Sequence, residues 1–437
     1  MQRMLARTGH ARVDELFAAI PAALRLARAL KVPEGRSEQE VFQHLATLAA
    51  QNEHAQAGPW FLGGGSYAHF LPSAVDALVS RAEFTTSYTP YQAEISQGTL
   101  QAVFEWQSML CALSGLDVTN ASMYDGASAT AEAALMAMRV TRRRKVAVAA
   151  GLHPHYRQVL ETYLAGLGAS LVTLSRGSDG RSAPAADALD DDTACLVLQQ
   201  PSFLGSIEDL RAAADAAHAC GALLVVGVAE ALSLALLEAP GALGADIVCG
   251  EAQSFGVPLA FGGPHLGFLA ARSAQLRQLP GRLVGQTVDA DGRRGFVLTL
   301  SAREQHIRRE RATSNICTNQ GLCLLMATVY LALLGRRGLR ELAELNLAKA
   351  EYAKSRVRQT RGLTLPLAAP SFNEFVIGLE GPAGRALERA RSKGIVAGLD
   401  LAPFAPELGP CVLFCTTELA SRESIDRAIA LLAGVAS

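Results

Sequence analysis

Short apolar segments alternate with helical patterns from about residue 61 onward. Seven of these segments are expected to form buried strands: KVAVAA (145–150), ASLVTL (169–174), ACLVLQQ (194–200), ALLVVGV (222–228), ADIVCG (245–250), HLGFLA (265–270) and FVLTL (296–300). Amphipathic patterns typical of helices lie between several of them, as at 155–167 and 209–221. Buried strands that alternate with helices predict an α/β fold whose large, mostly parallel sheet is covered on both faces.

The two ends of the chain have different patterns. Residues 1–60 are amphipathic with a break near Pro21, and they predict an N-terminal helical arm. Residues 61–335 contain the alternating elements of a large domain, and the long helix that begins after residue 318 is expected to stop at Gly335. Residues 336–437 predict a smaller C-terminal α/β domain, with strands at 372–379 and 411–417.

The composition argues against several classes of protein. Of the 437 residues 50% are hydrophobic and 19% charged, and the formal net charge is −1, so we expect a folded chain with a large core. This charge balance gives no reason to expect binding to nucleic acid or to a membrane surface. No apolar run reaches the ~18 residues of a membrane span. The eight cysteines are scattered, which predicts free, mostly buried thiols in a cytoplasmic protein.

Common nucleotide-binding and hydrolase motifs are absent from the sequence. No Gly-x-Gly-x-x-Gly joins a strand to a helix, no lysine follows a glycine as a phosphate loop requires, and no Gly-x-Ser-x-Gly occurs. His153 and His155 form the only close histidine pair, and no zinc-ligating residue follows them at a suitable spacing. We therefore expect no metal site.

Polar residues are concentrated between positions 83 and 130. The segment TTSYTPYQAEISQGTLQ (85–101) is rich in hydroxyl and amide side chains, and Asp125-Gly126-Ala127-Ser128 precedes an alanine-rich helix. Free backbone N–H groups and the positive end of the helix dipole make such a turn a candidate anion or phosphate site. An ordinary capped helix N-terminus explains the same motif equally well.

Five segments, in this order, resemble the N-terminal half of glycine decarboxylase, the P-protein of the glycine cleavage system: FLGGGSYAHFLP, YTPYQAEISQG, NASMYDGASA, FGVPLAFGGPH and TSNICTNQ. Some prokaryotes split this protein into two chains, and this chain is similar to the first, or α, chain. The resemblance implies a fold type I pyridoxal-phosphate (PLP) enzyme. It also implies a reaction in which glycine joins PLP and loses CO₂, and the aminomethyl group passes to the lipoyl arm of H-protein.

The resemblance further implies where the cofactor-binding lysine should be, and this chain lacks it. A fold type I site needs a lysine after a strand and an aspartate beside the pyridinium nitrogen. Gln253 occupies the lysine position and Gly227 the aspartate position. None of the five lysines is placed to replace it: Lys31, Lys145, Lys349, Lys354 and Lys393. We expect a degenerate pocket formed by His153, Asp125, Gly126, Ser128 and Gln253.

Because sites of this fold type lie at dimer interfaces, the resemblance implies that the chain completes an active site on a partner. Tyr88, Tyr91 and Gln92 are expected to reach that site as hydrogen-bonding or proton-carrying groups. Thr313, Ser314 and Asn315 are expected to contact the partner's PLP phosphate. The β subunit would hold PLP in an α₂β₂ assembly that acts on glycine and lipoylated H-protein, and this chain would be inactive alone.

Two alternatives stay open. In the first, the chain is an autonomous PLP enzyme whose lysine lies elsewhere in the sequence. In the second, it is a purely structural or regulatory paralogue that contributes no group to catalysis. The sequence by itself does not decide between them.

Overall fold

Two units make up the chain, residues 1–54 and 55–437. The structure, a computed structural model, describes residues 1–55, 57–183 and 188–434. The first unit contains two short helices, α1 (Gln2–Arg7) and α2 (Glu38–Ala49), with 3-10 turns between them at Val13–Phe17 and Ala22–Leu24. Regular helix covers less of this unit than the amphipathic pattern predicted, because prolines and glycines interrupt the intervening stretch.

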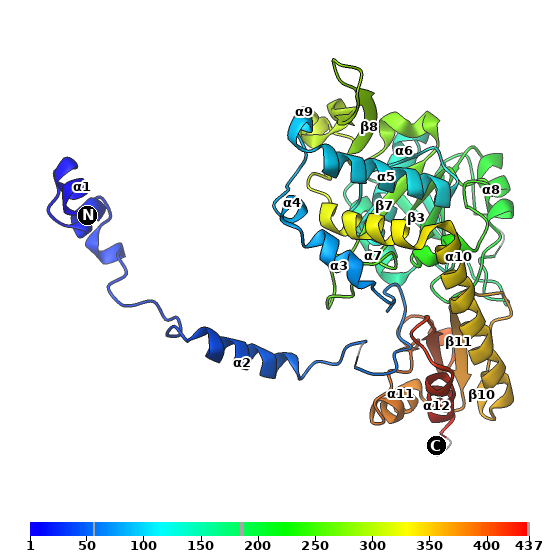
Figure 1. The fold of residues 1–437 in the computed structure, drawn as a ribbon. Helices are drawn as coiled ribbons and strands as arrows, with labels where there is room; N and C mark the ends of the chain where they lie inside the picture. The colour runs from blue at the N-terminus through cyan, green and yellow to red at the C-terminus, as the bar shows by residue number, and fades with distance from the viewer. Residues whose placement is uncertain (56, 184–187, 435–437) are drawn as a thin grey trace. The chain divides into compact units, whose positions relative to one another are not determined.

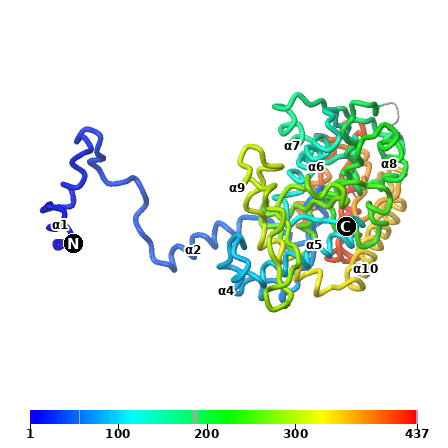
Figure 2. Tube along the Cα trace, turned by 90° about the horizontal axis from the view of Figure 1, so that it is seen from above, coloured from blue at the N-terminus to red at the C-terminus, as the bar shows by residue number. Residues whose placement is uncertain are grey.

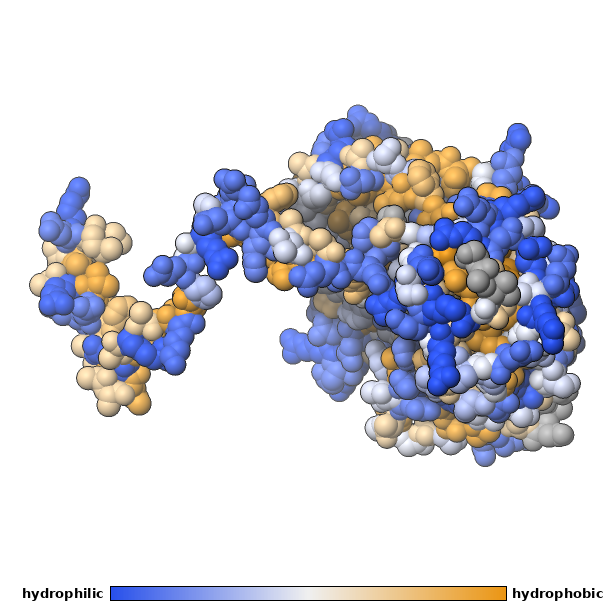
Figure 3. Space-filling model, turned by 90° about the horizontal axis from the view of Figure 1, so that it is seen from below, coloured by the Kyte–Doolittle hydropathy of each residue, from blue (hydrophilic) through white to orange (hydrophobic). Residues whose placement is uncertain are grey.

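Residues 1–54 have no hydrophobic core of their own. Leu5 is the one buried side chain in this range, and apolar side chains lie on the surface along the segment (Figure 3). The exposed large apolar residues are Met1, Met4, Val13, Leu16, Phe17, Ile20, Leu24, Leu26, Leu30, Val32, Val41, Phe42, Leu45 and Leu48. Exposed apolar surface on this scale is typical of a segment that packs on another protein.

A seven-stranded sheet lies at the centre of residues 55–437, in the order β1-β7-β6-β5-β4-β2-β3 (Figure 1). The five strands β2 to β6 run parallel to one another, and β7 pairs antiparallel with β6 and with β1. The strands are β1 (Val118–Thr119), β2 (Lys145–Val148), β3 (Ser170–Thr173), β4 (Thr193–Gln199), β5 (Leu223–Val228), β6 (Ile247–Glu251) and β7 (Gly267–Ala271). The predicted α/β class and mostly parallel sheet are confirmed.

Helices cover both faces of this sheet, and alternate strand residues point to opposite faces. In β2, Val146 and Val148 pack with α6 (Gly126–Thr141) and α7 (Pro154–Leu164). Ala147 packs on the other face, with α5 (Gln97–Ser114), α8 (Leu210–Ala219) and the first half of α10 (Gly321–Gln359). Figures 1 and 2 show these helices around the sheet. Burial on both faces explains why the central strands are apolar at nearly every position.

One predicted sheet strand was wrong. The segment 296–300 does not join the main sheet; it lies in β9 (Arg294–Thr299), which pairs only with β8 (Leu283–Val288) in a separate two-stranded hairpin. Phe296 is the one buried residue of β9, so its apolar pattern reflects a single packing contact rather than a central strand. Segment 169–174 was expected to be buried, but β3 is an edge strand and its Ser170 and Thr173 are exposed.

Helix α10 bends where the sequence predicted a stop. Gly335 lies inside it with φ +60° and ψ −178°, a conformation that favours glycine. By length and composition this helix is apolar enough to cross a membrane, but 44% of its apolar window is buried within the protein. A core helix of a globular protein passes the same test of length and composition, so this one helix is weak evidence for a membrane span.

A second sheet of four antiparallel strands forms the C-terminal part, in the order β10-β11-β13-β12. Its strands are β10 (Leu363–Thr364), β11 (Glu374–Leu379), β12 (Leu399–Asp400) and β13 (Cys411–Cys415). The second half of α10, together with α11 (Ala383–Arg391) and α12 (Arg422–Ala433), packs on one face. Phe203 and Leu204, from the loop after β4, pack on the other face and join the two sheets.

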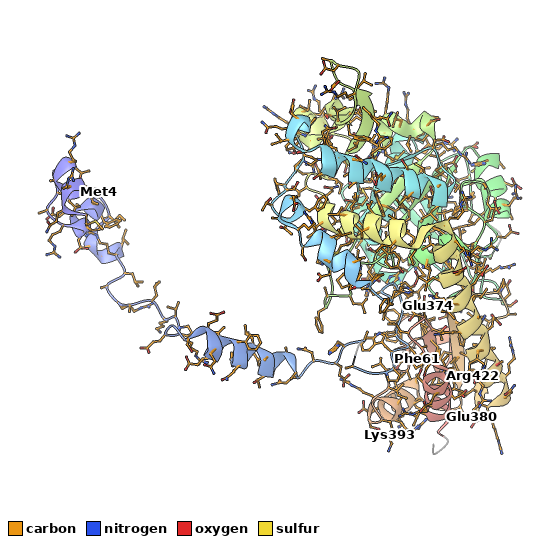
Figure 4. All side chains as sticks on the ribbon, in the orientation of Figure 1. Met4, Phe61, Glu374, Glu380, Lys393 and Arg422 are labelled. Atoms are coloured by element: carbon orange, nitrogen blue, oxygen red, sulfur yellow. The ribbon has the colours of Figure 1, made fainter. Side chains whose placement is uncertain are left out.

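The segment 61–70 ties the two sheets together. Phe61 lies against the small sheet, with its ring stacked on Phe414 at 4.6 Å, and Figure 4 shows it near Glu374 of β11. Farther along, buried His69 bonds Glu230 after β5 at 3.2 Å and Glu418 after β13 at 2.8 Å. Burial alone would lower the pKa of His69, but the two carboxylates raise it to about 10. A charged imidazolium therefore bridges the two sheets.

Truncation of Phe61 should destabilise the protein strongly. The side chain is fully buried, and loss of a buried aromatic ring costs about 3–5 kcal/mol. Urea unfolding of Phe61→Ala, followed by circular dichroism, measures the effect. Phe70→Ala is the matched control, because Phe70 is 61% exposed and should change the free energy of unfolding by less than about 0.5 kcal/mol. Equal losses in both variants would contradict the packing described here.

Candidate functional site

The candidate anion site at the start of α6 is filled by a carboxylate of the chain itself. Asp125 caps the helix: its Oδ1 accepts the Ser128 N–H at 2.7 Å. Buried Glu251, the last residue of β6, places Oε2 3.0 Å from the Gly126 nitrogen, which donates to it. Its Oε1 accepts N–H groups of Gln253 at 3.1 Å and Leu266 at 2.7 Å. Glu251 therefore occupies the position that a phosphate would take at this helix N-terminus.

His265 completes the surroundings of this carboxylate. Its Nδ1 lies 3.4 Å from Glu251 Oε2, and the hydrogen bond to Glu251 raises the pKa of His265. A side chain at position 126 would collide with Tyr156 and Glu251, so the space in front of the helix is already occupied. The histidine orders the loop after β6 around Glu251.

Gln253, at the position expected for a cofactor lysine, is buried and fully engaged. Its Oε1 accepts the Tyr67 N–H at 2.9 Å. Its Nε2 donates to the carbonyl oxygens of Tyr67 at 3.1 Å and Val257 at 2.7 Å. The amide thus holds the 61–70 segment across the place where the lysine side chain would extend.

His153, which the sequence placed in the degenerate pocket, packs against the chain's own backbone. Its Nε2 donates to the Gly64 carbonyl at 2.8 Å, and its Nδ1 accepts the His155 N–H at 3.1 Å. Gly65, with φ +101°, lies so close that a Cβ there would be 2.8 Å from His153 Nε2. Burial lowers the pKa of His153 to about 4, although the hydrogen bond to the Gly64 carbonyl opposes this shift. The imidazole is therefore neutral at pH 7.

These residues do not fit PLP. A Schiff base needs a lysine where Gln253 stands, the phosphate position at α6 is taken by Glu251, and His153 is covered by Gly64 and Gly65. All five predicted residues of the degenerate pocket thus bond within the chain: Asp125, Gly126, Ser128, His153 and Gln253.

None of the five lysines supplies a replacement. Lys145 pairs with Asp190, Lys349 donates to two backbone carbonyls after β13, and Lys354 pairs with Glu351 on α10. Lys31 and Lys393 are exposed, on the segment 1–54 and after α11.

The segment that contains Tyr88 and Tyr91 lies away from this pocket, against the residues that precede α10. The hydroxyl groups of Tyr88 and Thr318 are 3.0 Å apart, and Arg282 Nη2 donates to the Tyr91 hydroxyl at 3.1 Å. The ring of His306, in α9 (Gln305–Arg308), meets the Tyr91 ring edge-on at 5.3 Å. In both Figures 1 and 2, α4 (Ala82–Thr85) and α9 lie at the same edge of this unit. We call this surface, formed by residues 84–92 and 303–319 with Arg282, the tyrosine face.

The predicted phosphate-contacting residues differ in orientation. Asn315 is exposed on the tyrosine face, as are Tyr88, Tyr91 and Gln92. Thr313 Oγ1 instead donates to the Arg303 carbonyl at 3.1 Å, and Ser314 Oγ accepts the Ile316 N–H at 3.2 Å. The structure therefore brings both predicted segments to one surface, with four of the six side chains exposed.

A cavity of about 290 Å³ opens on the tyrosine face, between α5, the β8–β9 hairpin and the start of α10. Tyr88, Thr89, Thr318 and Arg282 line its polar side. Sequence reasoning missed Arg282, although an arginine in the otherwise apolar stretch 279–284 is a recognisable pattern. Among the described residues, no cluster of three or more His, Cys, Asp or Glu side chains suits a metal ion.

Comparison with known proteins places these features in a family. The family model described as glycine cleavage system P-protein matches residues 1–432. A relative from Anaeromyxobacter dehalogenans is 54% identical over 430 residues, which are 97% of this chain and 96% of the relative. One from Desulforamulus reducens is 51% identical over 436 residues, 99% of this chain and 97% of the relative. Both are named "Probable glycine dehydrogenase (decarboxylating) subunit 1".

Solved structures agree with these matches. A glycine decarboxylase (P-protein) of the glycine cleavage system, in inhibitor-bound form, has a TM-score of 0.91 and 45% identity, covering 99% of this chain and 97% of that chain. Glutamate decarboxylase of Lactobacillus brevis has a TM-score of 0.70 at 12% identity, and the match covers 97% of this chain and 96% of that chain. Sphingosine-1-phosphate lyase of Burkholderia pseudomallei has a TM-score of 0.66 at 16% identity, and the match covers 94% of this chain and 93% of that chain. The last two share only the fold, which is that of fold type I PLP-dependent enzymes.

The buried, neutral His153 should make stability depend on pH. The unfolded histidine takes up a proton near pH 6.5, whereas the folded one resists protonation until about pH 4. Stability from this group is therefore lost as pH falls below 6.5, by about 2 kcal/mol at pH 5. The variant His153→Asn retains a helix-capping side chain but has no imidazole to protonate, so it should not show this loss. Between pH 7 and pH 5 its free energy of unfolding should therefore rise by about 2 kcal/mol relative to that of wild type.

Urea unfolding at the two pH values measures this difference. Gln158→Asn serves as the control, because Gln158 is exposed on the same helix α7 and its substitution changes no titratable group. An identical pH dependence in wild type and His153→Asn would show that His153 accepts a proton in the folded state.

Proposed function

Because the chain belongs to the glycine cleavage system P-protein family, we propose that it completes the active site of a second, lysine-bearing chain. The relatives named as subunit 1 of glycine dehydrogenase (decarboxylating) are matched over nearly their full length, so the family's oxidoreductase function applies to the whole chain. The single observation that supports the division of labour is the closed pocket around Glu251, Gln253 and His153. A chain that fills its own cofactor position needs a partner to hold PLP.

The tyrosine face supplies the groups that this chain contributes. PLP, held by the partner β subunit, provides the electron sink for loss of CO₂ from glycine. The exposed Tyr88 and Tyr91 hydroxyls can donate hydrogen bonds or move protons at that site, and Gln92 lies beside them. Arg282 holds the Tyr91 hydroxyl in position.

A contact with the partner's PLP phosphate remains part of the proposal for the segment 313–315. The exposed Asn315 amide is available for such a contact in its present orientation. The hydroxyl groups of Thr313 and Ser314 are engaged within the chain, so they would contact a phosphate only after a change of rotamer. Asn315 is therefore the strongest candidate of the three.

The assembly that follows from this proposal is an α₂β₂ heterotetramer in the cytoplasm, which acts on glycine and lipoylated H-protein. The exposed apolar side chains of residues 1–54 support a stable protein partner, because that segment buries only Leu5 by itself. The names of the relatives also imply a second subunit. An autonomous PLP enzyme is disfavoured by the closed pocket, and a purely structural paralogue remains the alternative to test.

Borohydride reduction of the chain mixed with PLP should label none of its five lysines. In the mixture with its lysine-bearing partner, the pyridoxyl group should appear on the partner alone, as peptide mass spectrometry would show. Gln253→Lys should not create an aldimine by itself, because Glu251 still occupies the start of α6. A reducible absorbance band traced to a lysine of the wild-type chain would refute the proposed division of labour.

Removal of the tyrosine hydroxyls should lower activity without loss of assembly. Tyr91→Phe and Tyr88→Phe are expected to reduce glycine–CO₂ exchange by the two-chain enzyme at least about tenfold, the lower range for a group that moves protons. Gel filtration checks that the complex still forms. Tyr163→Phe, on α7 and outside the tyrosine face, should leave exchange unchanged. Full activity in both face variants would favour the structural paralogue.

A further inference from the structure

Two neighbouring side chains contact Tyr91, the tyrosine that the proposed function assigns to the partner's active site. Arg282 Nη2 donates to its hydroxyl at 3.1 Å, and the guanidinium carbon lies 5.3 Å from the centre of the tyrosine ring. The ring of His306 meets that of Tyr91 edge-on, also at 5.3 Å. Because Tyr91 is 51% exposed, no enclosing core fixes its side chain. Its orientation therefore depends on these two contacts.

A single buried carboxylate lies beside both of the contacting groups. Glu304 Oε2 is 3.6 Å from Arg282 Nε and 3.7 Å from His306 Nδ1. The side chains of Arg282 and Glu304 are buried, whereas that of His306 is partly exposed. Glu304 is thus the common neighbour of the two groups that contact Tyr91.

The preceding residue, Arg303, anchors Glu304 in this position. Its guanidinium donates to the carbonyl oxygens of Leu279 and Gly281, just before Arg282 in the chain. Its own carbonyl oxygen accepts the N–H and the hydroxyl of Thr313. The segment that carries Glu304 is therefore tied to the segment that carries Arg282 by bonds that do not involve the two charges themselves.

Stability alone does not account for the buried pair. Arg282 Nε, Arg282 Nη1 and Glu304 Oε1 are all buried with no hydrogen-bond partner among the described residues. Unmade hydrogen bonds of buried charged groups are costly, and a buried ion pair is often no more stabilising than apolar side chains of similar volume. The hydrogen bond that the Arg282 side chain does make goes to the Tyr91 hydroxyl. Orientation of that hydroxyl explains the pair better than stability does.

We propose that Glu304 is a positioning residue for the Tyr91 hydroxyl, and that it acts through Arg282 and His306. Its negative charge attracts the guanidinium, and the imidazole when that ring carries a proton, so that both stay against the tyrosine. The inference rests on the proposed function, in which Tyr91 reaches the partner's active site. Glu304 itself is buried and acts only through its neighbours.

Glycine–CO₂ exchange by the two-chain enzyme tests the proposal through a double-mutant cycle. Glu304→Gln removes the charge but keeps the size of the side chain, and it should lower kcat about fivefold while KM for glycine changes less than about twofold. In the Tyr91→Phe background the same substitution should cause no further loss, because no hydroxyl remains to be oriented. A residue that only stabilises the fold would lower activity by the same factor in both backgrounds.

Glu341→Gln is the matched control. Glu341 also pairs with an arginine, Arg337, at 2.7 Å, but its side chain is 59% exposed on α10 and lies outside the tyrosine face. This substitution should change neither kcat nor KM. Circular dichroism, and gel filtration with the partner chain, establish that each variant folds and assembles.

A second variant covers the case in which Glu304→Gln does not fold. His306→Asn removes a partly exposed imidazole and its contact with Tyr91, and it should lower kcat about threefold in the wild-type background and not at all in the Tyr91→Phe background. Unchanged kcat in the folded variant, or equal losses in both backgrounds, would overturn the proposal.

Tyr91→Phe by itself separates this failure from a failure of the proposed function. If Tyr91→Phe is impaired and the losses are nevertheless additive, the role of Glu304 is wrong and the role of the tyrosine stands. If Tyr91→Phe is fully active, both roles are wrong.

Discussion

The carboxylate of Glu251 at the start of α6 is the interaction on which the interior of this chain depends. It accepts hydrogen bonds from three backbone N–H groups: Gly126 at the start of α6, Gln253 in the turn after β6, and Leu266 just before β7. The helix dipole favours a negative charge at that position. A fixed internal anion therefore occupies the start of α6 and joins three segments of the fold.

The segment 61–70 packs into the same interior region. Backbone at Gly64 and Gly65 packs on His153 between the two sheets, and the Tyr67 amide group pairs with Gln253. Glu374 accepts the Gly64 N–H and the Tyr67 hydroxyl, and burial raises the pKa of this carboxyl to about 7. Together with the His69 bridge, these bonds hold the two sheets as one body.

Sequence reasoning was successful where burial alone decides the structure. The four parallel strands β2, β4, β5 and β6 are buried along nearly their whole length, and α10 bends at Gly335, a residue that tolerates positive φ. The hairpin β8–β9 was missed because one buried Phe296 produced a strand-like pattern without a central position in a sheet. Gln253 and His153 were identified as pocket residues, but Glu251 and Arg282 were not. Their roles depend on groups more than a hundred positions away in the chain.

The sequence by itself determined the family, the fold class and the absence of a lysine at position 253, because these follow from the order of apolar segments and from residue identity. Only the tertiary structure decided that the vacated pocket is filled from within, and that Tyr88, Tyr91, Arg282 and Thr318 share one surface. The reason is physical. Apolar patterning is a local property of the chain, whereas the pairing of buried charges and hydroxyls is set by contacts between segments that only folding brings together.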